Sequence, residues 1–195
     1  MVKGFLLTGL LAFSLGWSVV GFGIENPPNG VTRQLKVKAA LSFSPGFLTE
    51  KTKTIQLHGY LGCRPNSGKI ELRGDGFYFL DSFGDRPRFT MNHQLFAGAF
   101  YRFSDQRFQP YVGFQPGIAY SQSSEFGVLN NVTSEIEFKK TSNPVGSVAG
   151  GIDFFSEKLF FMFVETRYIF GKHKADSYPV FLDEFRISFG LGFHF

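Results

Sequence analysis

The stretch DEFRISFGLGFHF, residues 183–195, decides the fold class of this chain. From Phe185 to Phe195 every second residue is apolar, and the residues between them are Arg186, Ser188, Gly190, Gly192 and His194. A two-residue period places alternate side chains on opposite faces of a β-strand, whereas a helix would mix them. The segment therefore predicts a strand with one wholly apolar face.

The same alternation recurs along the rest of the chain. Seven further strands are predicted, at residues 34–43, 54–63, 69–79, 89–103, 110–121, 145–154 and 159–170. Strands separated by turn-rich stretches, with no competing helical period, are typical of an all-β protein.

The connections between these strands alternate in length. Those after the second, fourth and sixth strands are short (64–68, 104–109, 155–158), and the others are longer (44–53, 80–88, 122–144, 171–182). Short periplasmic turns and longer outside loops are typical of bacterial outer-membrane barrels. We therefore predict an eight-stranded antiparallel transmembrane up-and-down β-barrel in the outer membrane, with both ends of the chain on the periplasmic side.

The first residues have the composition of an export signal. Lys3 precedes an apolar run at residues 5–20, and small residues follow at Gly21 and Gly23. A transmembrane helix is the alternative, but the run is shorter than the ~20 residues that a helical span needs. We predict a cleavable signal peptide at residues 1–23 and a barrel domain at residues 24–195.

The overall composition excludes several classes of protein. The chain has 27 Phe and 23 Gly, only 18% charged residues and a net charge of +4, so no basic surface for nucleic acid is indicated. Cys63 is the single cysteine, so the chain has no intramolecular disulfide.

Alternation alone does not say which face points outward, since a soluble lipocalin-like barrel would turn its apolar face inward. The polar face of the fifth, sixth and eighth strands carries small and mostly uncharged residues: Gly113, Gln115, Gly117, Ala119, Ser147, Ala149, Gly151, Ser188, Gly190 and Gly192. Such residues suit a crowded interior better than a surface in water. We therefore expect the polar face to line the lumen.

Charged residues on that face would meet inside the barrel, where an unpaired charge is costly. We predict a lumenal ion-pair network formed by Lys36, Lys38, Glu71, Arg73, Asp75, Arg102, Glu165, Arg167 and Arg186. Eight strands leave an interior that side chains can fill, so an open pore is disfavoured.

The outward face should carry an aromatic girdle at each membrane interface. For the periplasmic girdle we predict Tyr101, Phe103, Tyr111, Phe154, Phe160, Phe193 and Phe195. For the extracellular girdle we predict Phe43, Tyr78, Phe89, Tyr120, Tyr168 and Phe170.

Three motifs resemble the OmpA-type and opacity-protein-like outer-membrane barrels: PYVGFQPGIAY at 110–120, VETRY at 164–168 and GLGFHF at 190–195. The resemblance covers essentially all of residues 24–195 and implies a fold and an assembly route, but no activity. The alternating terminal residues Phe189, Leu191, Phe193 and Phe195 are similar to the signal that the barrel-assembly machinery recognises.

No phosphate loop, zinc spacing or nucleophile elbow occurs in the predicted barrel, so we predict no enzyme, cofactor or metal. The nearest catalytic assembly would be a lipid A-modifying site at the outer rim, formed by His173, Asp176, Ser177 and Asp183. A narrow ion or small-solute channel is the other alternative.

The longest loop is the best candidate for binding, because loops on a rigid scaffold usually carry function. Its candidate interaction residues are Asn130, Asn131, Glu135, Glu137 and Lys139, and residues 133–141 alternate as though a hairpin extended beyond the membrane. We expect a structural or adhesin-like role through this loop. The expected partners are outer-membrane lipid and lipopolysaccharide, the barrel-assembly machinery and a surface or host ligand.

Overall fold

The computed structural model describes residues 35–48, 52–65, 68–84, 89–124, 127–131, 134–155, 159–174 and 179–195. The predicted signal peptide, residues 1–23, lies outside this part of the chain. No helix in the described ranges combines the length and the hydropathy needed to cross a bilayer.

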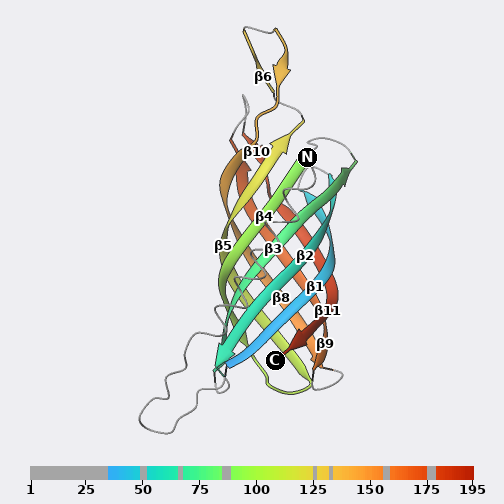
Figure 1. Cartoon of the computed structure of the whole chain (residues 1–195), viewed down its shortest axis with the longest axis vertical. Coiled ribbons are helices and arrows are strands. Elements are labelled where there is room, and N and C mark those ends of the chain that lie inside the picture. The colour runs from blue at the N-terminus through green and yellow to red at the C-terminus, as the bar shows by residue number, and fades with distance from the viewer. Residues whose placement is uncertain are drawn as a thin grey trace, which may run out of the picture. The chain divides into compact units, whose positions relative to one another are not determined.

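Eight long strands form a closed antiparallel barrel (Figure 1). They are β1 (Leu35–Leu48), β2 (Lys53–Pro65), β3 (Ile70–Phe83), β4 (Phe89–Arg102), β5 (Phe108–Ser123), β8 (Thr141–Phe155), β9 (Phe160–His173) and β11 (Glu184–His194). Each of these strands pairs with the next long strand along the chain, and β1 pairs with β11 to close the barrel. The predicted fold class is confirmed.

Three short strands lie at the end of the barrel with the long loops. The strands β6 (Val128–Leu129) and β7 (Ile136–Glu137) form a hairpin, and β10 (Val180–Phe181) pairs with the end of β9. The β6 strand stands beyond the rim in Figure 1, and the C-terminus lies at the opposite end.

Several strands run further than predicted, because the alternation of side chains continues through residues that usually mark turns. Strand β1 includes Pro45 and ends at Leu48 instead of residue 43. Proline has no N–H for the ladder, and the β1–β11 pairing is interrupted at Ser44 and Pro45. The Ser44 and Ser188 hydroxyls hydrogen bond to each other across this gap at 2.7 Å.

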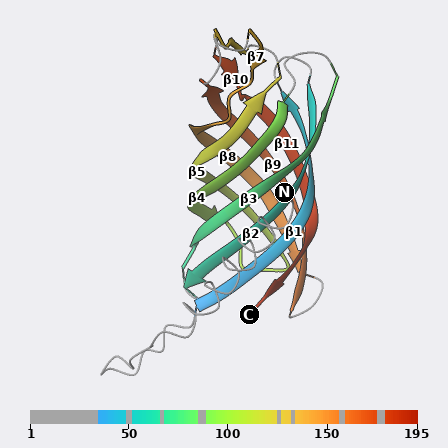
Figure 2. The ribbon, with the colours of Figure 1, turned by 45° about the horizontal axis from the view of Figure 1, so that its top comes forward.

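The apolar face of the barrel points outward. Leu41, Leu95 and Leu191 are 76%, 68% and 62% exposed, whereas the polar side chains of the same strands are buried. Figure 2 shows the tilted strands that carry this surface around the barrel. An exterior of this kind is stable only in lipid, so the barrel spans a membrane, and barrels of this type lie in the bacterial outer membrane.

Ten predicted girdle aromatics are exposed on the outside: Tyr101, Phe103, Phe160, Phe193, Phe195, Phe43, Tyr78, Tyr120, Tyr168 and Phe170. Phe154 is half-buried. The prediction was wrong for Phe89 and Tyr111, which are both buried inside the barrel. An irregularity in the β4–β5 register between Phe89 and Met91 turns Phe89 inward. Tyr111 shares its face with Gln115, which also points inward.

Glycine makes room for aromatic side chains in the lumen. A Cβ atom on Gly113 would lie 2.3 Å from the Phe100 ring, and one on Gly192 would lie 2.3 Å from the Phe161 ring. The many glycines of the polar face therefore allow large rings and charged groups to fill a narrow interior.

Candidate functional site: a filled lumen and an extracellular hairpin

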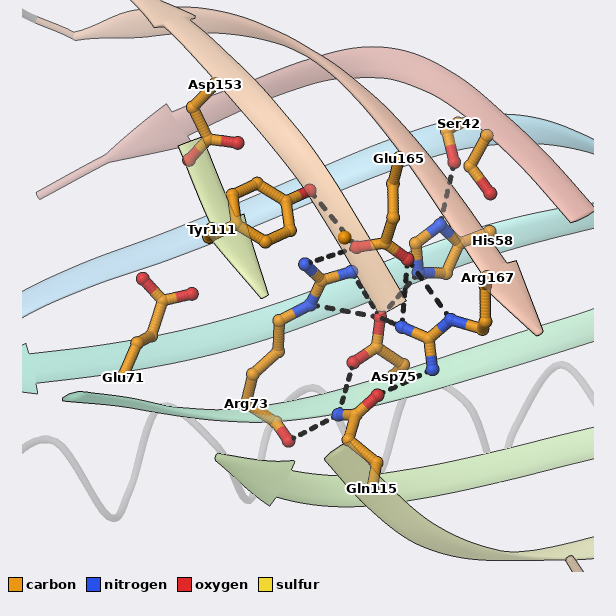
Figure 3. A network of polar contacts seen from close by, with 12 residues as sticks. Ser42, His58, Glu71, Arg73, Asp75, Tyr111, Gln115, Asp153, Glu165 and Arg167 are labelled. Atoms are coloured by element: carbon orange, nitrogen blue, oxygen red, sulfur yellow. Dashed lines mark hydrogen bonds and ion pairs between the residues drawn. The ribbon is translucent and has the colours of Figure 1, made fainter. Parts of the chain in front are cut away.

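Two arginines and two carboxylates form the central cluster of the lumen (Figure 3). The Arg73 Nη1 atom lies 2.8 Å from Glu165 Oε2, and the Arg167 Nη2 atom lies 3.0 Å from Asp75 Oδ1. Arg73 also pairs with Asp75, and Arg167 with Glu165, so each cation contacts both anions. All four side chains are buried, and the cluster joins strands β3 and β9 across the barrel.

Neutral side chains complete this cluster. The Gln115 amide donates to Asp75 at 2.7 Å and accepts a hydrogen bond from Arg167 at 2.5 Å. The Tyr111 hydroxyl donates to Glu165 at 3.1 Å. Because these hydrogen bonds add to the ion pairs, the desolvation cost of the buried charges is largely offset.

A second cluster lies nearer the periplasmic end. Asp153 accepts hydrogen bonds from Lys38 at 2.8 Å and from Arg102 at 2.7 Å. Arg102 also pairs with Glu71 through two nitrogens. This cluster joins β1, β3, β4 and β8.

A third contact lies nearer the extracellular end. Arg186 pairs with Glu184 at 2.5 Å, and Glu184 also accepts a hydrogen bond from Thr54. At the periplasmic rim, Arg64 pairs with Asp105 at 2.7 Å.

Counting Lys, Arg, Asp and Glu only, each cluster is electrically balanced. The central and periplasmic clusters each contain two cations and two anions, and the other two pairs contain one of each. The structure thus places eight of the nine predicted network residues in ion pairs. Lys36 is half-buried on the same face, and no ion pair of its ammonium group is found within the described ranges.

Sequence reasoning missed Asp153, Glu184 and Arg64. The signal was present for two of them, because Asp153 is in phase with Ala149 and Gly151 and Glu184 is in phase with Arg186. Both lie at strand ends, where a residue can equally belong to a turn.

Apolar side chains pack in the extracellular end of the lumen beside buried polar residues such as Thr54, Ser121 and His173, and the sequence analysis did not predict this apolar cluster. Buried residues of this apolar cap come from five elements or their flanks: Leu48, Phe79, Phe89, Ile169, Val180 and Leu182. The cap lies between the central ion-pair cluster and the extracellular solvent, whereas Glu184 lies level with the cap, opposite Leu48 and Ile169.

The groups His58, Asp75 and Glu165 have the spacing of a metal site, with candidate ligand atoms within 4.8 Å of one another. However, the two carboxylates already bind the guanidinium groups of Arg73 and Arg167. The guanidinium groups therefore supply the positive charge that a metal ion would bring.

The contacts of His58 follow the order of a hydrolytic triad. Its Nδ1 atom lies 2.8 Å from Ser42 Oγ and its Nε2 atom lies 2.7 Å from Asp75 Oδ1 (Figure 3). All three residues are buried, and the His58 ring stacks on Phe77 at a centroid distance of 4.2 Å. A nucleophile enclosed in this way has no path to a substrate, so the arrangement serves packing and hydrogen bonding.

The proposed rim enzyme site is not assembled in the described residues. His173 is buried at the end of β9, where its Nδ1 atom lies 2.9 Å from Ser121 Oγ. Asp183 accepts the Gly171 N–H at 3.1 Å. Asp176 and Ser177 lie outside the described residues.

The predicted interaction loop contains the β6–β7 hairpin. Asn131, Glu135, Glu137 and Lys139 are exposed, while Asn130 is half-buried and donates to Glu137 at 2.7 Å. Leu129 and Ile136 expose 58% and 63% of their surface. The Gln122 amide donates to the Phe138 carbonyl at 2.8 Å and so ties the hairpin to β5.

No protein-family model matches the sequence, and no curated protein matches it. Solved structures do match its fold. Neisserial surface protein A is 15% identical with a TM-score of 0.61, over 83% of this chain and 97% of that one. OprG from Pseudomonas aeruginosa is 12% identical with a TM-score of 0.56, over 84% and 97%. Ail of Yersinia pestis, solved with the heparin analogue sucrose octasulfate, is 12% identical with a TM-score of 0.50, over 83% and 97%. The chain therefore has the fold of the small eight-stranded outer-membrane β-barrels, as its resemblance to the OmpA-type superfamily implied.

Proposed function

We propose that this protein is a non-enzymatic outer-membrane barrel that acts in surface interaction through its extracellular hairpin. The observation that carries the proposal is the contrast between the lumen and the hairpin. The lumen is filled by balanced ion pairs beneath an apolar cap, whereas Leu129 and Ile136 are exposed beyond the barrel. The exposed side chains of the hairpin can contact a partner, whereas the charges of the lumenal clusters already contact one another.

The hairpin has the features of a recognition element. Within the described residues its two short strands pair only with each other, so an extended segment of a partner could add to their outer edges by backbone hydrogen bonds. Exposed Leu129 and Ile136 offer apolar contact, and Glu135 and Lys139 offer charges of both signs. The internal hydrogen bonds of the hairpin lower the entropy lost on binding.

The experiment that tests this proposal compares adhesion of cells displaying the wild-type chain with cells displaying a variant that lacks residues 127–138. The probes are immobilised fibronectin, laminin, collagen and heparin; heparin is included because Ail was solved with a heparin analogue. We expect adhesion of the wild type to at least one probe and its loss in the deletion variant. The double variant Leu129→Ser and Ile136→Ser, which keeps the backbone of the hairpin, should lose most of the adhesion.

The heat-modifiable electrophoretic shift, in which the unboiled barrel runs faster than the boiled chain, serves as the control for folding. A deletion variant that folds and adheres as well as the wild type contradicts the proposal. So does a wild type that adheres to none of the probes above the level of cells without the protein.

A channel function is the alternative, and the apolar cap argues against it. Continuous conduction needs a wetted path, and Ile169 and Leu182 are fully buried at the extracellular end of the lumen. We expect no stepwise conductance in planar bilayers, either for the wild type or for Arg167→Gln. Regular conductance steps that change in Arg167→Gln would favour the channel.

An enzyme acting on lipid A is the other alternative. Lipid A chains would reach the outside of the barrel, whereas His173 points inward and is buried. Overexpression should therefore leave the lipid A mass spectrum unchanged. A mass change that disappears in His173→Ala would establish the enzyme.

Assembly by the barrel-assembly machinery is the remaining part of the proposal. The outward residues at the C-terminal end of the chain, Phe189, Leu191, Phe193 and Phe195, are all exposed on the side that faces the lipid. A surface-exposed apolar stripe of this kind is available to an assembly factor before the barrel closes against β1.

A further inference from the structure

A shallow groove on the outside of the barrel plays no part in the function proposed above. It encloses about 330 Å³ between Phe114 and Pro116 of β5, Pro144 and Gly146 of β8, and Phe170 of β9. Its walls face the lipid, because Phe114 and Phe170 are 55% and 40% exposed on the apolar exterior.

The local sequence explains the depression. Strand register places Pro116, Gly146 and Phe170 side by side in one row across three strands. Gly146 contributes no side chain to this row, and a Cβ atom there would lie 2.4 Å from the Phe170 ring. Pro116 beside Gly146 and Pro144 two residues before it are compact, so a depression remains between the larger rings of Phe114 and Phe170.

Two lysines follow the groove toward the extracellular end. Lys172 is the next outward residue of β9 after Phe170, and Lys174 is the outward position after that. Both are exposed, and the Lys172 ammonium lies 4.7 Å from the centre of the Phe181 ring of β10, which pairs with β9 on the side opposite β8. The Lys174 backbone N–H donates to the Asn143 side chain at 3.2 Å. Lys172 therefore follows the groove along β9, and Lys174 lies one residue beyond the end of that strand, at the rim.

The groove lies in the extracellular half of the barrel. Phe170 is close to the end of β9 at His173, and Pro144 is close to the start of β8 at Thr141. This half of the barrel crosses the outer leaflet, whose lipid in Gram-negative bacteria is lipopolysaccharide. Its lipid A anchor combines phosphate groups at the interface with several acyl chains below them.

We propose that this surface is a lipopolysaccharide-binding site. One acyl chain of lipid A lies in the groove against Phe114 and Phe170, and Lys172 and Lys174 bind a lipid A phosphate. Basic side chains next to apolar membrane-facing pockets bind anionic head groups in this way. The assignment is independent of the hairpin, so either proposal can fail alone.

The test uses the full chain extracted from the outer membrane in mild detergent, delipidated and titrated with purified lipid A in native mass spectrometry. We expect one lipid A to remain bound. Each lysine near an anionic surface raises the binding affinity about fivefold. The double variant Lys172→Gln with Lys174→Gln should therefore bind lipid A about 30-fold more weakly. Phe170→Ala should weaken it separately by removing a wall of the groove.

Matched controls lie elsewhere on the same surface. Lys53→Gln removes an exposed lysine at the extracellular end of β2, and Phe43→Ala removes an outward ring of β1. Neither strand borders the groove, so neither variant should change binding. Three results overturn the site: equal binding by the double lysine variant, equal weakening by Lys53→Gln, or phosphatidylglycerol binding as tightly as lipid A.

Discussion

Glu165→Gln is the variant that tests most directly whether the lumen is a closed, charge-balanced core. The substitution keeps the shape of the side chain and a group that can contact Tyr111, but it removes one of the two negative charges of the central cluster. Arg73 and Arg167 are then left with Asp75 alone. Leaving a buried ion without its partner costs about 3–5 kcal/mol, and we expect a loss of unfolding free energy in that range.

A double-mutant cycle separates charge balance from packing. Arg167→Met alone leaves an excess negative charge and should cost a similar amount. The double variant Glu165→Gln with Arg167→Met restores neutrality, so its loss should be smaller than the sum of the single losses by about 2–3 kcal/mol. Gln115 and Ser147 lose a hydrogen-bond donor in both variants that carry Arg167→Met, so this cost cancels in the cycle.

The assay is urea unfolding in detergent, with the folded fraction measured from the heat-modifiable band on unboiled gels. Tryptophan fluorescence is unsuitable because the single tryptophan, Trp17, lies in the predicted signal peptide. A Glu165→Gln variant within about 0.5 kcal/mol of the wild type would refute the reasoning, because that value is typical of a solvated surface change. Water would then reach the central cluster.

Three further predictions concern the seam, the last residue and the topology. Ser44→Ala removes the hydroxyl contact across the gap in the β1–β11 ladder and should lower the unfolding free energy by about 1 kcal/mol in the same assay. Deletion of Phe195 should reduce the amount of folded barrel in cells but leave the unfolding free energy of the refolded protein nearly unchanged. A comparable loss in both quantities would mean that Phe195 acts through packing and not through assembly. Cys63 lies at the periplasmic end of β2. An impermeant maleimide added to intact cells should therefore label Lys53→Cys and leave Cys63 unmodified. Labelling of Cys63 alone would show that the topology is the reverse of the one described.

Much of the barrel followed from local patterns in the sequence. The alternation at residues 183–195 and the unequal loop lengths predicted the strands and their direction. The small residues of the polar face, such as Gly113 and Ser188, predicted that this face points inward. Together these patterns also predicted that Arg73, Asp75, Glu165 and Arg167 share the lumen. These predictions succeeded because the two-residue period of a strand is set by backbone geometry and is visible in the chain itself.

Two of the failures occurred where the period is broken or ends. An irregularity in the β4 register turned Phe89 inward. Tyr111 is a different case, because it is in phase with Gln115 and the alternation itself places it in the lumen against Glu165. Asp153 at the end of β8 closes the periplasmic cluster, although in the sequence it resembles a turn residue. The positions of Phe89 and Asp153 depend on where a strand slips or stops, which its own residues specify weakly.

The sequence alone thus determined that the chain forms membrane strands with a polar interior, because the alternation of side chains and the small size of the residues on the polar face are local properties. Only the tertiary structure decided which charges meet, that apolar residues such as Phe79 and Leu182 cap the lumen, and that a groove on β8 lies beside Lys172. The charge pairs and the cap join strands far apart in the chain, and the groove joins β5 to β8 and β9. Their geometry depends on the stagger between neighbouring strands and on closure of the barrel, which no single segment of the sequence contains.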